Sequence, residues 1–67
     1  MAVVKTIDLV GVSPTSWRDA AQEALKEAAR SLRGIESMDI LDTSCNVEGS
    51  EITEYKTHVR IKFRLDR

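Results

Sequence analysis

Two segments of the chain have the composition or the alternating pattern of β-strands. Residues 3–12 are rich in β-branched side chains and carry two charges, a composition typical of a strand that Gly11 and the Ser13-Pro14 pair should end. Residues 55–65 alternate strictly, which is the strongest strand pattern in the sequence. Their apolar set comprises Tyr55, Thr57, Val59, Ile61, Phe63 and Leu65.

Between these segments, the spacing of apolar residues predicts an amphipathic helix. Ser16 and Asp19 match a Ser-x-x-acid capping pattern, and Pro14 suits the helix entrance. Gly34 is a typical stop signal, so the helix is expected to run to about Arg33. One face is mostly alanine and predicts a thin core; it comprises Trp17, Ala20, Ala21, Ala24, Leu25, Ala28 and Leu32.

Residues 35–47 predict a strand with an interruption. Met38 and Ile40 share one face, whereas Leu41 and Cys45 lie on the other. This shift of phase indicates a bulge or bend near Leu41, or a strand covered on both faces. With a turn at residues 48–51, the fold class is α+β: a βαββ domain over residues 1–67, with a three-stranded antiparallel sheet packed on one helix.

The small size of the chain limits its core. It has 67 residues, of which three are aromatic and one is cysteine, and a domain of this size buries only about 60% of its unfolded surface. Cys45 alone cannot form an internal disulfide, and with one histidine, His58, there is no Cys/His zinc set. Oligomerisation is the remaining source of stability, so we expect an oligomer.

The charge balance excludes several partners. Ten Lys and Arg residues oppose eleven Asp and Glu residues, and the pI is 5.7, so no basic field attracts nucleic acid or a membrane surface. No apolar run approaches the roughly 20 residues of a membrane span. Residues 1–5 are too short and too soon charged for a signal peptide. We expect a cytoplasmic protein without nucleic-acid or membrane partners.

The sequence offers no catalytic machinery. It contains no triad, paired acid–base motif or glycine-rich phosphate loop, and we predict that the protein is not an enzyme. Cys45 is interpreted as a small strand residue, and His58 has no evident carboxylate or nucleophile partner. Trp17 is interpreted as a core or subunit-contact residue.

The polar face of the last strand is a basic row. It could line an anion site, or it could be a structural face neutralised by the acids Asp8, Glu36, Asp39 and Asp42. The balanced overall charge favours the structural interpretation. The row comprises Lys56, His58, Arg60, Lys62 and Arg64.

Two groups of acids are candidates for a hard cation, calcium or magnesium. Their spacing matches no calcium loop, so a site would depend on symmetry that brings carboxylates of several chains together. The ligand residues stay undetermined. The groups are Glu36, Asp39 and Asp42, and Glu48, Glu51 and Glu54.

Three strings, in this order and spacing, resemble the dodecin family. They are Val10-Gly11-Val12-Ser13-Pro14-Thr15-Ser16-Trp17, Ser31-Leu32-Arg33-Gly34-Ile35 and Val59-Arg60-Ile61-Lys62-Phe63-Arg64-Leu65. The resemblance covers nearly the whole chain. It implies a hollow, roughly spherical homododecamer with two-fold and three-fold axes that stores and quenches flavins.

In flavin-binding dodecins, two flavins stack between tryptophans of two-fold-related subunits, and a glutamine on the third strand binds the ring edge. The matching positions here are Ser37 and Lys56. Serine lacks a stacking surface worth about 1–3 kcal/mol per contact in the nucleic-acid analogue. Lysine accepts no hydrogen bond and carries a charge that must be desolvated. We therefore expect riboflavin or FMN binding to be weak or absent.

The resemblance and these two departures together predict a function. We expect a homo-oligomeric shell that binds or stores a small ligand or ion, because some dodecin relatives without the flavin sandwich have been linked to cation binding. The alternatives are a flavin-binding dodecin with a modified site, and a structural oligomer without a ligand.

Overall fold

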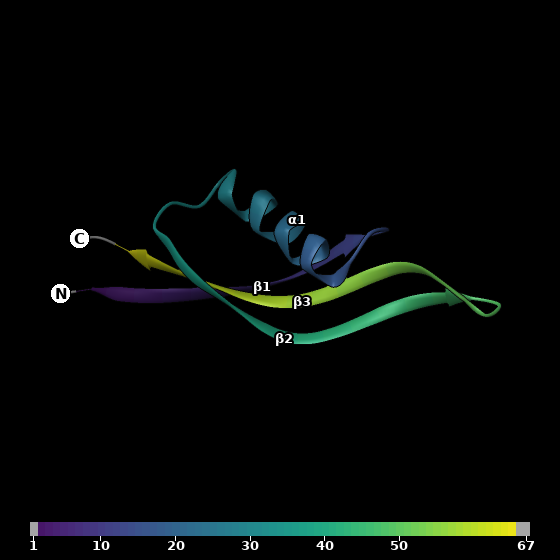
Figure 1. The fold of residues 1–67 in the computed structure, drawn as a ribbon. Helices are drawn as coiled ribbons and strands as arrows, with labels where there is room; N and C mark the ends of the chain where they lie inside the picture. The colour runs from purple at the N-terminus through teal and green to yellow at the C-terminus, as the bar shows by residue number, and fades with distance from the viewer. Residues whose placement is uncertain (1, 66–67) are drawn as a thin grey trace.

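The computed structural model describes residues 2–65, which form one three-stranded sheet and one helix (Figure 1). The elements are β1 (Val3–Ser13), α1 (Trp17–Ala29), β2 (Ile35–Glu48) and β3 (Glu51–Leu65). The sheet has the order β1-β3-β2, and both pairs are antiparallel, so the last strand lies in the middle. The predicted βαββ order and fold class are confirmed.

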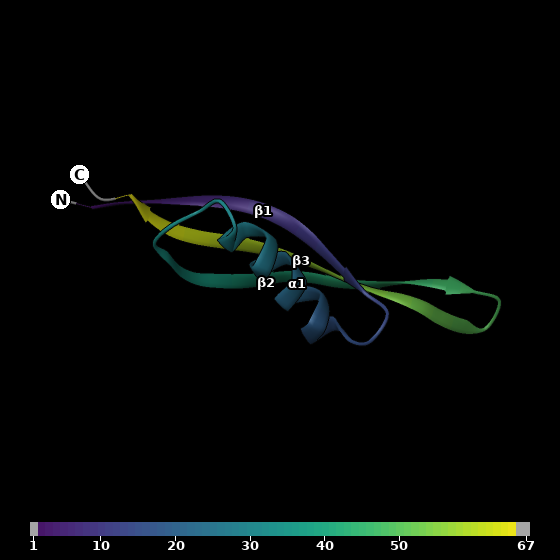
Figure 2. The same ribbon diagram turned by 90° about the horizontal axis from the view of Figure 1, so that it is seen from above.

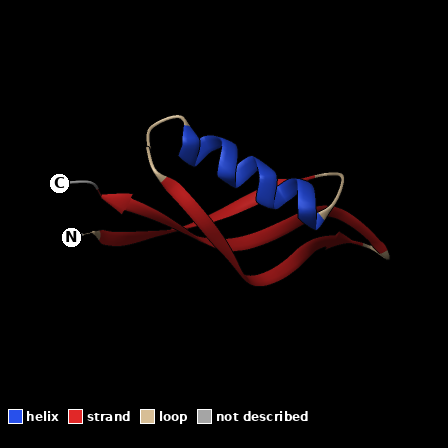
Figure 3. Ribbon diagram, turned by 60° about the vertical axis from the view of Figure 1, so that its left-hand side comes forward, coloured by secondary structure: helices blue, strands red, loops and turns tan. Residues whose placement is uncertain are grey.

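The helix covers only one face of the sheet, as Figure 3 shows. It packs mainly on β1 and β3 and barely touches β2. Seen from above in Figure 2, it runs obliquely across the β2 side of the sheet and leaves the β2–β3 hairpin projecting beyond it. The opposite face of the sheet has no covering element in the described chain.

The core between α1 and the sheet is small, as the sequence predicts. Four of its buried residues are alanines, which fill the gap without burying much area each. The remaining buried apolar side chains come from alternate positions of β3. The full set is Ala20, Ala21, Ala24, Ala28, Val59, Ile61 and Phe63.

Gly11 lets the helix approach β1 closely. A Cβ at this position would overlap the carbonyl oxygen of Ala20 and lie 3.1 Å from the Cβ of Ala24. The first strand runs to Ser13, which pairs with Tyr55, one residue beyond the expected end at Val12, so Gly11 lies within the strand and does not help to end it. Gly11 is needed within the strand because no side chain fits there.

The start of α1 is as predicted, but its end is not. The hydroxyl of Ser16 accepts a hydrogen bond from the Asp19 N–H at 3.0 Å, which confirms the helix cap. The helix ends at Ala29 with Arg30 as its C-cap, several residues before Arg33. Leu32 therefore belongs to the following loop, although it still packs on the core.

A bulge at Leu41 explains the phase shift in the second strand. Ile40 pairs with Val59 and Asp42 pairs with His58, so Leu41 is the extra residue. Beyond it, Cys45 pairs with a residue on the helix side of β3 and so shares a face with Ile40. The predicted bulge is confirmed; two further register shifts, at Ile35/Ser37 and Asn46/Val47, were not predicted.

The folded chain is elongated, with extents of 52 × 19 × 12 Å. Its radius of gyration is 13.8 Å, whereas a compact chain of this length has about 11 Å. It exposes 4961 Å², about 700 Å² more than a typical monomer of this mass. A single copy is therefore less compact than a typical monomer and leaves more of its surface exposed.

Candidate functional site

The face of the sheet opposite α1, here called the outer sheet face, gathers most of the candidate residues. Strand side chains alternate between the two faces, and the strand register aligns them across the sheet. This face carries Val4, Thr6, Asp8, Val10 and Val12 from β1, the basic row Lys56, His58, Arg60, Lys62 and Arg64 from β3, and Ser37, Asp39, Asp42 and Ser44 from β2.

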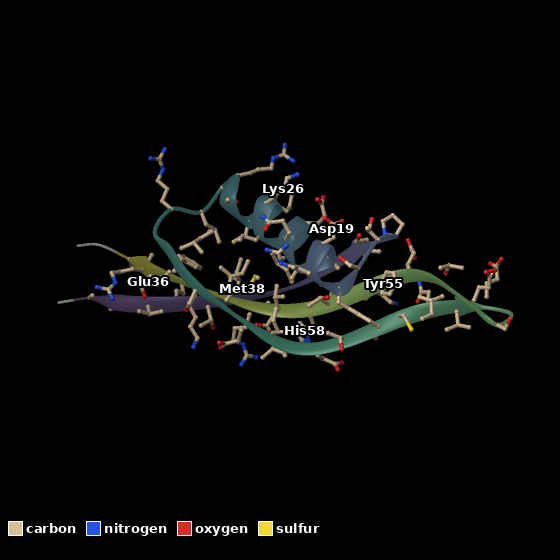
Figure 4. The ribbon with its side chains drawn as sticks, in the orientation of Figure 1. Asp19, Lys26, Glu36, Met38, Tyr55 and His58 are labelled. Carbon is tan, nitrogen blue, oxygen red and sulfur yellow. The ribbon has the colours of Figure 1, made fainter. Side chains whose placement is uncertain are left out.

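Acids from both neighbouring strands neutralise much of the basic row. Arg60 makes two bonds to the Asp8 carboxylate, at 2.8 and 3.1 Å. Lys62 lies 3.1 Å from a carboxylate oxygen of Asp39. Arg64 lies on the same strand as Lys62, and its Nε atom is 2.6 Å from Oε2 of Glu36 on β2. Glu36 is labelled near the left end of the sheet in Figure 4. These pairs bear out the structural interpretation for three of the five basic residues.

The Asp8–Arg60 pair shifts both groups toward their charged forms. Hydrogen bonds from the Arg60 guanidinium lower the pKa of Asp8 below its ordinary 3.8, against a weaker opposing effect of desolvation. The hydrogen bond to Asp8 raises the pKa of Arg60. Because the folded pKa of Asp8 is lowered, its stabilising effect is present above the unfolded pKa. It disappears as the pH falls through the lowered folded value.

His58 has a carboxylate neighbour in Asp8, one of the acids expected beside the basic row. Its Nε2 atom lies 3.4 Å from Asp8 Oδ2, and Asp42 lies opposite it on β2. The spacing in the sequence alone does not make this particular pairing evident. Asp8 is fifty residues earlier in the chain and reaches His58 only because β3 lies next to β1.

Ser37 and Lys56, the positions that match the flavin contacts of the family, lie far apart within one chain. Ser37 pairs with Lys62, and Lys56 pairs with Ser44. Lys62, which lies opposite Ser37, is six residues from Lys56 along β3, and this separation corresponds to about 20 Å. Both residues lie on the outer sheet face, but the chain does not bring them together.

The candidate cation ligands are also dispersed. Among residues 2–65, no group of three His, Cys, Asp or Glu side chains is arranged to hold a metal ion. Asp42 makes no ion pair within this range. Glu48 and Glu51 face each other at the end of the hairpin, and Glu54 accepts a hydrogen bond from Asn46 at 2.8 Å.

Trp17 anchors the start of the helix to the sheet. Its indole Nε1 donates to the Ser44 carbonyl at 2.8 Å, and its ring meets Tyr55 edge-on at 4.7 Å between centroids. The Thr57 hydroxyl donates to the Trp17 carbonyl at 2.8 Å. Trp17 nevertheless stays 40% exposed, so a single copy of the chain buries its side chain only in part.

An open groove lies beside Trp17, between the first half of α1 and β2. Its volume is about 370 Å³. The groove exists because α1 packs mainly on β1 and β3 and makes few contacts with β2. Met38, labelled in Figure 4, lies on this side of the sheet. The groove is lined by Trp17, Arg18, Ala21, Gln22, Met38, Ile40, Thr43 and Thr57.

No helix in residues 2–65 has the length and apolar composition needed to cross a membrane.

The βαββ chain, with one charged and uncovered sheet face, defines a class of small α+β proteins rather than a particular activity. The family model Dodecin matches residues 3–66. The chain belongs to the dodecin family.

Individual relatives agree with this assignment. The calcium dodecin of Mycobacterium tuberculosis is 32% identical over 65 residues, covering 97% of this chain and 92% of that protein. Its crystal structure, described as having a novel calcium-binding site, matches with a TM-score of 0.83 over 96% of this chain and 91% of that one. A mutant of the Thermus thermophilus dodecin matches with 27% identity and a TM-score of 0.94 over the whole of both chains.

Proposed function

We propose that this protein assembles into a homododecameric shell that binds a small ligand or ion at sites shared between subunits, with calcium as the preferred ion. The observation that carries this proposal is the large apolar surface that one copy leaves exposed. Of the described residues, nine large apolar side chains are exposed: Val3, Val4, Val10, Val12, Trp17, Ile40, Leu41, Val47 and Ile52.

The form of the sheet supports self-association. Both edge strands are long, with 11 residues in β1 and 14 in β2, and an uncovered edge strand offers unpaired backbone groups to another chain. The excess surface of about 700 Å² is close to one side of a standard interface, roughly 800 Å² per partner. Family membership supports the same conclusion, since the resemblance to dodecins implies a twelve-subunit shell.

A shared site suits a hard cation better than a site within one chain. Calcium takes about six to eight oxygen ligands, and magnesium needs a stricter octahedral arrangement. One copy offers no such cluster among its described residues, but a carboxylate beside a three-fold axis supplies three oxygens or more. Asp42 suits this role because, unlike Asp8 and Asp39, it has no basic partner in the described chain.

The similarity to a calcium dodecin supports calcium as the ion. Dodecins are binding and storage proteins, which supports binding rather than catalysis. The Ser37 and Lys56 positions support weak flavin binding, because neither residue can replace the aromatic and amide contacts that they match.

We expect calcium to raise the midpoint of thermal unfolding by at least about 5 °C relative to a chelator, because an ion bound only by the folded assembly stabilises it by mass action. The Asp42→Asn variant should lose most of this shift. The measurement is differential scanning calorimetry at a fixed protein concentration, with the ion content checked by elemental analysis.

The matched control is Asp39→Asn, the same chemical change on the same strand and face. It removes the ion pair with Lys62, so its baseline midpoint should fall, while its calcium shift should persist. Equal midpoints of the native protein in chelator, calcium and high salt would contradict the proposed ion binding.

A further inference from the structure

The end of the β2–β3 hairpin projects from the rest of the molecule. Pairing with β1 stops at Tyr55, so residues 46–54, here called the hairpin tip, form a ribbon of two strands (Figures 1 and 2). Val47 is 61% exposed and Ile52 is 50% exposed on this ribbon. A two-stranded hairpin is only marginally stable by itself in water, so the tip gains from being covered.

The groove beside α1 offers a complementary apolar surface. Ile40 is 53% exposed on its floor, and Met38 and Trp17 also line it. Such contiguous exposed apolar surface is typical of an interaction site. The tip of the same chain cannot fill it, because Val47 and Ile40 lie seven residues apart on one continuous strand, a separation of about 23 Å.

The charges at the two surfaces are opposite. Glu48 and Glu51 pair with each other across the tip, and like charges in directly opposed positions repel. Arg18 lies at the edge of the groove. It is exposed, and none of the ion pairs in residues 2–65 involves it. A cation brought to the tip would offset the repulsion between the two glutamates.

We infer that the hairpin tip of one copy seats in the groove of a second copy, with Val47 and Ile52 against Ile40 and Met38, and with Glu48 and Glu51 beside Arg18. This interface rests on the proposed assembly and specifies one of its contacts. It is a head-to-tail contact, because two different surfaces meet. Such contacts close into rings when the rotation permits, as at a three-fold axis.

Charge reversal tests this inference by native mass spectrometry across a dilution series. Arg18→Glu should shift the concentration at which the assembly dissociates upward by at least tenfold, because three acids then meet. The tip variant Glu48→Arg with Glu51→Arg should do the same. Combining all three changes should restore assembly at the concentration of the native protein.

The matched control combines the tip variant with Arg33→Glu. Arg33 is also an exposed arginine, in the loop after α1 and outside the groove, so this combination should not restore assembly. Far-UV circular dichroism checks the fold of each variant. If Arg18→Glu loses its helix signal, the tip variant, which leaves α1 unchanged, supplies the comparison with the native protein, and an unchanged dissociation concentration would then overturn the contact.

The outcomes separate this inference from the proposed function. A native protein that stays monomeric overturns the proposed assembly itself. An assembly that is unaffected by Arg18→Glu, or that the triple variant fails to restore, overturns the tip-in-groove contact and leaves the shell intact. A groove that takes a different protein belongs to this second outcome, since self-assembly would then not depend on its charge.

Discussion

Replacing Gly11 with alanine is expected to lower the free energy of unfolding by about 3 kcal/mol or more, the upper part of the range for overpacked sites. The new methyl group would overlap the Ala20 carbonyl oxygen and lie 2.8 Å from its carbonyl carbon. Backbone atoms cannot rotate away as a side chain can, so α1 must move off the sheet. That movement opens the alanine-lined core, and the unfolding midpoint should fall by at least about 12 °C.

Gly49→Ala is the matched control for Gly11→Ala. Its Cβ would meet no atom within 4 Å, but its φ of 65° is left-handed. We expect a cost of about 1–2 kcal/mol from that conformation alone. Thermal unfolding followed by circular dichroism compares the two variants. A Gly11→Ala midpoint equal to or above that of Gly49→Ala would show that the helix has room to move.

The double change Ser37→Trp with Lys56→Gln is expected to strengthen riboflavin binding roughly ten- to a hundredfold or more per flavin, since each aromatic stacking contact contributes about 1–3 kcal/mol. The native protein should purify without flavin. Ser37 offers no aromatic surface, and Lys56 lacks the acceptor of an amide. Because the two residues lie about 20 Å apart in one chain, a flavin that contacts both would need more than one subunit. Quenching of riboflavin fluorescence measures the gain.

Ser44→Trp with Lys56→Gln is the control for this flavin experiment. It adds the same indole to the same strand and face, but opposite Lys56 instead of Lys62. It should leave riboflavin binding weak. Tight quenching by the native protein would show that another residue supplies the stacking, and no gain in the Ser37 variant would show that the pocket between subunits has closed.

Local patterns were sufficient for most of the fold. Strict alternation identified the last strand, and the capping residues Ser16 and Asp19 identified the start of α1. The phase shift near Leu41 indicated a bulge, a bend or a strand covered on both faces, and the structure has the bulge, because an extra residue exchanges the two faces of a strand. These features depend on neighbouring residues, so the sequence displays them directly.

Other features depend on contacts between distant parts of the chain. Gly11 resembles a strand terminator until α1 is seen to lie against it. The helix ends at Ala29 because the chain turns to reach β2, although apolar spacing continues to Leu32. His58 gains Asp8 as a neighbour only through the β1–β3 register.

The sequence predicted which residue types make up the candidate site but not how they are arranged in space. The acids expected beside the basic row included Asp8, Glu36 and Asp39, which do pair with it. The sequence could not show that Asp42 forms no ion pair within residues 2–65 or that the hairpin tip extends beyond β1. Both depend on how the strands pair, since β1 pairing ends at Tyr55 and Asp42 lies opposite His58.

The mass of the native protein at micromolar concentration tests the central claim most directly. Light scattering coupled to size-exclusion chromatography should give twelve times the 7.5 kDa chain mass, because a single copy has a thin core and a large exposed apolar surface. Dilution should cause dissociation and unfolding together. A well-folded monomer or dimer at micromolar concentration would contradict the account.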